Sequence, residues 1–162
     1  MNYEYFRYPQ GKSGKPQGKC ASQKKTATIM NIEQARDWAL SMPFATEDEF
    51  SPQWISYRID GKWFMLIQLN APDPRIALKL PPADNIELRT RYSAIRPAYH
   101  MNHTHWSDIY LNGEISDNMI EQLIRRSYAL VASRLPKSSA HYDYIHSAAL
   151  EELAQTLDEI EK

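Results

Sequence analysis

The strongest constraint on the fold of this chain is a pair of β-type segments joined by two turn-forming residues. Residues 54–59 and 62–69 are rich in β-branched and aromatic side chains, and Asp60-Gly61 stands between them. This dipeptide favours a two-residue type I′ turn, in which both turn residues take positive φ angles. We therefore predict a β-hairpin over 54–69, against which the rest of the chain has to pack.

Further strands are predicted on the C-terminal side of this hairpin. The run 75–80 alternates apolar and less apolar residues, which predicts a third strand with Arg75 and Lys79 on the same face. A short strand is expected over 108–111. The acidic run 47–49 is typical of a solvated turn, although adjacent carboxylates also suit acid–base work or a Mg²⁺ ion.

Four helices are predicted, three from apolar residues at helical spacing and the second because it follows Pro81-Pro82 and has Arg89 and Arg91 near its C-terminal end. They are expected over about 32–42, 83–92, 117–135 and 139–160. Asn31 is the expected N-cap of the first helix, with Gln34 completing a capping box, and Ser116 or Asp117 caps the third. The last helix has an apolar stripe opposite an acidic face, so the stripe must be buried in the domain itself or against a partner chain.

These elements predict an α+β fold: an antiparallel sheet with helices packed on one side, plus an extra C-terminal helix. A chain of 162 residues, 43% of them hydrophobic, suits one domain with extensions. We expect a flexible basic tail over 1–29, a domain over 30–137 and an acidic amphipathic helix over 138–162.

The charge is unevenly distributed along the chain. The net charge is −1, but residues 1–29 hold six basic residues against one acidic residue, and 138–162 hold six acidic residues against one basic residue. The central part is nearly balanced, so nucleic acid binding would need a local basic surface rather than a basic domain. The lone Cys20, the lack of an apolar run that could span a membrane and the polar N-terminus favour a cytoplasmic protein.

The segment 95–106, with the sequence Ile-Arg-Pro-Ala-Tyr-His-Met-Asn-His-Thr-His-Trp, gathers three of the five histidines. It is too polar for a core and too aromatic for an ordinary solvated loop, which favours a ligand-facing surface. Pro97 forces the preceding residue into an extended conformation, so no helix is expected here. The alternative is structural: the aromatic side chains pack on the sheet and the polar ones fix an irregular segment.

Catalytic and metal-binding patterns are weak in this sequence. His100, His103 and His105 have a spacing that could place imidazoles near a metal, but a third ligand would have to fold back to join them. Cys20 lies in the tail, no serine sits in a glycine-flanked elbow, and five glycines leave little room for a phosphate-cradling loop. We expect a non-enzymatic protein with no cofactor and no metal.

Several short motifs occur along residues 30–137. They are Pro43-Phe44, Gly61-Lys62-Trp63-Phe64, Ile76-Ala77-Leu78-Lys79, Leu88-Arg89, Tyr92, 95–102, His105-Trp106, Leu111-Asn112-Gly113 and Ser127-Tyr128. Together they resemble the MmcQ/YjbR family of small bacterial DNA-binding-like proteins, and the resemblance covers about residues 30–137. It implies an antiparallel sheet backed by helices in a double-wing arrangement, and DNA as the partner.

For a DNA-binding protein of this type, cations would contact phosphates, polar groups would face base edges and aromatic rings would stack. The candidate residues are Lys79, Arg89, Arg91, Arg96, Tyr99, His100, Asn102, His103, His105 and Trp106. We expect the four Lys and Arg residues to form one contiguous positive surface, and Arg96, His103 and His105 to face outward. His103 stands where the family often has a lysine, which weakens phosphate affinity near neutral pH.

The alternative is a protein- or small-ligand-binding module, either a monomer or a homodimer that self-associates through the C-terminal helix. It would place an aromatic-lined concavity beside Tyr99 and Trp106.

Overall fold

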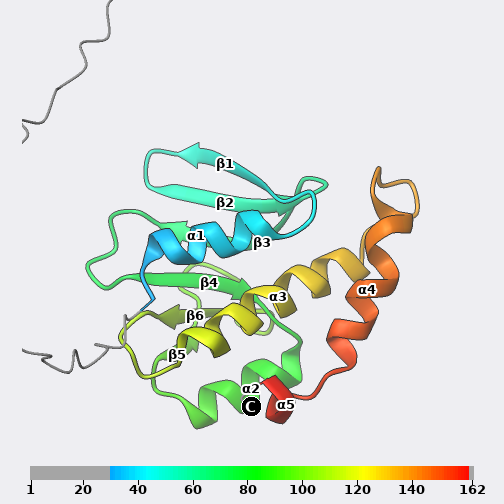
Figure 1. The fold of residues 1–162 in the computed structure, drawn as a ribbon. Coiled ribbons are helices and arrows are strands. Elements are labelled where there is room, and N and C mark those ends of the chain that lie inside the picture. Colours follow the sequence, from blue (N-terminus) through cyan, green and yellow to red (C-terminus); the bar gives the residue numbers. More distant parts are fainter. Residues whose placement is uncertain (1–29, 161–162) are drawn as a thin grey trace, which may run out of the picture.

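The computed structural model describes residues 30–160, which form an α+β fold with one antiparallel sheet (Figure 1). The expected basic tail over 1–29, Cys20 and the last two residues of the chain lie outside the described residues. Within 30–160, no helix is both long enough and apolar enough to cross a lipid bilayer.

Six strands form the sheet in the order β1-β2-β3-β4-β6-β5, with every neighbouring pair antiparallel. The strands are β1 (Thr46–Ser51), β2 (Trp54–Ile59), β3 (Lys62–Gln68), β4 (Arg75–Lys79), β5 (Ile95–Pro97) and β6 (Trp106–Tyr110). The predicted hairpin is confirmed as β2 and β3. Its turn residues Asp60 and Gly61 have φ angles of 44° and 78°, which agrees with a turn that needs positive φ at both positions.

The sequence pattern misses two of these strands. The acidic run 47–49 is not a turn, because it lies in β1 and pairs with β2 at the edge of the sheet. Most side chains of β1 are exposed, so the strand lacks the alternation that marks a half-buried strand, and its carboxylates suit an unpaired sheet edge. β5 is three residues long and pairs only with β6, which itself begins at Trp106 rather than at 108.

The helices are α1 (Ile32–Ser41), α2 (Pro82–Arg91), α3 (Asp117–Ser133), α4 (Tyr142–Ala154) and α5 (Leu157–Ile160). The capping box of Asn31 and Gln34 is confirmed, and Ser116 caps α3 by accepting a hydrogen bond from the backbone N–H of Met119. The prediction of one helix over 139–160 is wrong, because the chain makes turns up to His141 and breaks again between α4 and α5.

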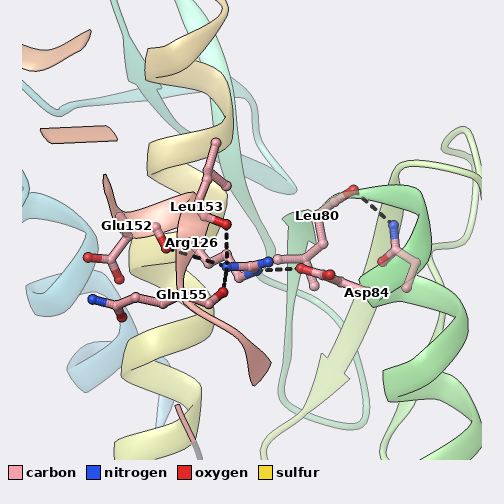
Figure 2. A network of polar contacts seen from close by, with 7 residues as sticks. Leu80, Asp84, Arg126, Glu152, Leu153 and Gln155 are labelled. Carbon is pink, nitrogen blue, oxygen red and sulfur yellow. Dashed lines mark hydrogen bonds and ion pairs between the residues drawn. The ribbon is translucent and has the colours of Figure 1, made fainter. Parts of the chain in front are cut away.

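The break after α4 coincides with a buried arginine (Figure 2). Arg126 on α3 donates to Asp84 of α2 through Nε, and through Nη1 to the backbone carbonyls of Glu152, Leu153 and Gln155 at 3.4, 3.4 and 3.0 Å. The last carbonyls of a helix have no partner inside the helix. Arg126 supplies that partner from another element, so the carbonyls at the end of α4 are paired where the helix stops.

The main core lies between the sheet and the helices α1 and α3, which cross the same face of the sheet (Figure 1). The apolar stripe of the C-terminal segment joins this core through Ile145, Ala149, Leu157 and Ile160, so it is buried within the chain. Along β4, Ile76 and Leu78 enter the main core, whereas Ala77 belongs to a second cluster. This second cluster consists of Leu66, Ala77, Ala98 and Trp106.

Candidate functional site

A hollow of about 480 Å³ opens where β3 begins, β4 ends and β6 begins, beside the end of α3. We call it the basic hollow. It is lined by Gly61, Lys62, Trp63, Lys79, Trp106, Val131 and Arg134. Three of these seven residues are cationic and two are tryptophans, a combination that suits a ligand carrying both negative charge and a flat apolar group.

The hydrogen bonds of one buried serine fix the position of the hollow. Ser127 on α3 donates from its hydroxyl to the carbonyl oxygen of Phe64 in β3 and accepts a 2.9 Å hydrogen bond from the backbone N–H of Lys79 in β4. Lys79 in turn pairs in register with Trp106 of β6. The serine therefore joins the helix to two strands at the level of the hollow, so that the lining residues are held by rigid elements.

The cations of the basic hollow differ from most other arginines of the domain. Among residues 30–160, a carboxylate partner is present for Arg36, Arg58, Arg75, Arg91, Arg125 and Arg126. Within the same range, Lys62, Lys79 and Arg134 form no ion pair. Burial lowers the pKa of the Lys79 ammonium, and the nearby charges of Arg134 and Lys62 lower it further. The three side chains thus act on one another as an uncompensated positive cluster.

The aromatic part of the site consists of one exposed ring pair and one buried ring. Trp63 stacks on Phe50 of β1 with ring centroids 5.1 Å apart, and the two residues are 37% and 43% exposed. The guanidinium of Arg58 lies 5.7 Å from the centre of the Trp63 ring. Trp106 is only 8% exposed and packs in the second cluster, so it forms a wall of the hollow rather than a free stacking surface.

Of the four residues predicted to form a contiguous positive surface, Lys79, Arg89, Arg91 and Arg96, only Lys79 lines the basic hollow. Arg89 donates hydrogen bonds to groups of the chain itself, and Arg91 pairs with Glu87 and Asp158. Arg96 lies over the ring of Tyr110 at 4.7 Å. The alternation of β4 correctly predicts that Lys79 points away from the main core. Which side chains of other elements lie beside Lys79 depends on the packing of distant segments.

Arg89 and Asn85 of α2 hold the segment 102–107 in place. Arg89 donates to the carbonyl oxygens of His103 and Trp106, both at 2.7 Å, and to the hydroxyl of Ser107 at 3.0 Å. The amide of Asn85 donates to Thr104 O at 2.9 Å and accepts from the Ser107 hydroxyl at 2.7 Å. Burial lowers the pKa of Arg89, although a guanidinium stays charged in proteins. These contacts give both residues a structural role.

Within the histidine-rich segment, the structural alternative holds for Trp106 but not for Tyr99, which is 68% exposed. His100 is also exposed and has a φ angle of 65°, with its ring 3.8 Å from that of Tyr99. The side chain of Asn102 accepts a hydrogen bond from the Thr104 N–H, which shapes the turn before β6.

The outward orientation predicted for Arg96 and His103 is confirmed, since both are exposed. His105 departs from that prediction, because it is half-buried and its Nδ1 is buried without a hydrogen-bond partner among the described residues. Across residues 30–160, no group of three or more His, Cys, Asp and Glu side chains is placed to hold a metal ion.

Sequence reasoning missed three residues of the hollow as candidates for binding: Lys62, Trp63 and Arg134. For the first two a signal was present, because they directly follow the Asp60-Gly61 turn and were bound to lie at the end of the hairpin. Arg134 comes just after α3, and no local pattern indicates that this end of the helix reaches Lys79.

Comparisons with known proteins agree with this architecture. The model of the YjbR family matches residues 40–130. Protein YbdF of Escherichia coli O157:H7 is 37% identical over 106 residues, covering 65% of this chain and 87% of that protein. Protein YjbR of Escherichia coli strain K12 is 28% identical over 110 residues, covering 67% and 92%. Lys62, Trp63, Lys79 and Trp106 lie within the matched region, whereas Arg134 lies beyond it.

Two solved structures have a similar fold. A Deinococcus radiodurans protein superposes with a TM-score of 0.64 at 23% identity, covering 68% of this chain and 86% of its own, and shows the fold alone. A Pseudomonas syringae protein has a TM-score of 0.54 at 31% identity, covering 62% and 98%.

Proposed function

The chain belongs to the YjbR family, and we propose that it is a non-enzymatic DNA-binding protein that contacts phosphates through the basic hollow. The observation that carries this proposal is the cluster of Lys62, Lys79 and Arg134, which line one hollow and form no ion pair among residues 30–160. Keeping three cations together without a carboxylate costs electrostatic repulsion, which a bound phosphate would relieve.

The proposed surface differs from the one expected from the sequence. Lys79 is common to both, but Lys62 and Arg134 replace Arg89, Arg91 and Arg96 as phosphate contacts. Arg89 and Asn85 act indirectly, by holding the segment that brings Trp106 to the hollow. A cluster of this size suits a small footprint of few phosphates, in keeping with the nearly neutral net charge of the chain.

The salt dependence of binding tests this proposal. The full chain is titrated against a fluorescein-labelled duplex carrying a random-sequence single-stranded overhang, and the dissociation constant is measured by anisotropy across a salt series. If three phosphates are neutralised, the logarithm of the association constant should fall with the logarithm of the salt concentration with a slope of about −2 to −3. Lys62→Ala and Lys79→Ala should each weaken binding and reduce the magnitude of the slope by about 1.

Arg36→Ala provides the matched control, because Arg36 lies on α1 and pairs with Glu47, so its removal should leave the slope unchanged. No binding at low salt, or a slope near zero, would contradict the proposed function. If Arg36→Ala reduced the magnitude of the salt slope as much as Lys79→Ala does, the phosphate contacts would have to lie outside the basic hollow.

The lowered pKa of Lys79 predicts a dependence on pH. As the pH rises through a pKa that lies below the ordinary value of 10.5, Lys79 loses its charge and DNA affinity should fall. A Lys79→Arg variant keeps its charge, so its dissociation constant should rise less over the same alkaline range. Anisotropy titrations at a series of pH values compare the two proteins, and parallel curves would show that Lys79 does not contribute charge to binding.

A further inference from the structure

The stacked pair of Phe50 and Trp63 is a feature that phosphate binding alone does not use. The two rings come from β1 and β3 and remain 43% and 37% exposed, although Phe64, Met65 and Ile67 of β3 are buried in the main core. Trp63 also lines the basic hollow, so the exposed pair is continuous with the cation cluster. An apolar ring surface beside uncompensated cations fits a ligand in which flat rings alternate with negative charges.

The number of cations bears on whether the site suits a double-stranded or a single-stranded nucleic acid. Three cations can neutralise only a few phosphates, so phosphate contacts supply a limited share of the affinity. Stacking of a base on an aromatic side chain adds affinity of its own without needing a particular base. In a duplex, the faces of each base are already covered by neighbouring base pairs, whereas a single strand leaves them free to stack.

We propose that the basic hollow takes single-stranded DNA, with a phosphate held by Lys62, Lys79 and Arg134 and an unpaired base stacked on the Trp63–Phe50 pair. This inference rests on the proposed function and specifies its ligand. The buried Trp106 forms a wall of the hollow and does not stack on the base. The guanidinium of Arg58 lies beside the Trp63 ring and is paired with Asp48, so it is not counted among the phosphate contacts.

The test compares two probes on the full chain: labelled oligo(dT) of about 12 nucleotides, a length within the site sizes of single-strand-binding folds, and a duplex hairpin of the same length. Oligo(dT) should bind more tightly than the hairpin. Trp63→Leu should weaken oligo(dT) binding by about 5- to 150-fold, the range that corresponds to the loss of one stacked base. Because stacking releases no counterions, this variant should leave the salt slope unchanged, unlike Lys79→Ala.

Two further variants separate stacking from damage to the fold. Phe50→Leu removes the second ring without touching the lining of the hollow, and should also weaken oligo(dT) binding. Tyr144→Leu removes an aromatic ring that is 69% exposed on α4, outside the hollow, and should have no effect. Circular dichroism and thermal unfolding of each variant verify that the fold is intact.

The outcomes distinguish the two proposals. If the hairpin binds as tightly as oligo(dT), or if Trp63→Leu and Phe50→Leu both leave oligo(dT) affinity unchanged, the single-strand inference is overturned. A salt slope that still depends on Lys62 and Lys79 would then leave the proposed function standing. Absence of binding to both probes at low salt would overturn both.

Discussion

Replacement of Arg126 by methionine is expected to destabilise the protein by about 3–5 kcal/mol, because it leaves the buried carboxylate of Asp84 without its partner. The same change removes the donor that the three carbonyls at the end of α4 share (Figure 2). Removal of the Arg126 side chain should therefore weaken the contacts of α3 with both α2 and α4. Urea unfolding followed by circular dichroism measures the change in the free energy of unfolding.

The neighbouring residue provides the control for this prediction. Arg125→Ala removes a cation from the same helix, but Arg125 forms a partly exposed pair with Glu121 one turn away, which is worth about 0.5 kcal/mol or less. A double variant with Arg126→Met and Asp84→Leu should be more stable than Arg126→Met alone, because no unpaired charge remains buried. Equal losses for Arg125→Ala and Arg126→Met would show that burial of the pair is not what matters.

Replacement of Arg89 by leucine is expected to cost about 2–4 kcal/mol, because it leaves the carbonyl oxygens of His103 and Trp106 and the Ser107 hydroxyl without a charged donor. The effect should be local as well as global. Hydrogen exchange at the backbone N–H of Trp106, which donates to Asn102 O, should become faster. Since Trp106 lines the basic hollow, DNA affinity should fall although Arg89 itself lies outside the lining.

Arg91 offers a matched control two residues further along α2. It is partly exposed and pairs with Glu87 and Asp158, so Arg91→Leu should cost about 1 kcal/mol or less and leave exchange at Trp106 unchanged. Unchanged exchange at Trp106 in the Arg89→Leu variant would contradict the assignment of Arg89 as the residue that holds this segment.

The apolar stripe of the C-terminal segment is the feature that suggested self-association of the chain. Its apolar residues pack on the chain's own core, among them Ile145 and Leu157, so they are not free to bind a partner chain. The observation that motivates self-association through this helix is therefore accounted for within one chain. The hollow lined by Trp106 does provide a concavity, but Tyr99 takes no part in it.

Local patterns predicted a large part of the fold. Features that depend on residues only a few positions apart can be predicted from the sequence. They are the hairpin at Asp60-Gly61, the helix caps at Asn31 and Ser116, and the choice of which side chains of β4 enter the main core. The motifs of the hairpin and the histidine-rich segment also identified the family, which the comparisons confirm. β1 was missed because an exposed edge strand carries no apolar alternation.

The sequence by itself therefore determined the family, the α+β class and most of the elements. Only the tertiary structure decided which charges remain available. Arg89 and Lys79 look alike in the sequence, but Arg89 is used to fix a backbone segment while Lys79 meets Lys62 and Arg134 in one hollow. The physical reason is that a cation's availability depends on which carboxylates and carbonyls lie within hydrogen-bond distance, and in this chain those groups come from residues as far as 67 positions away.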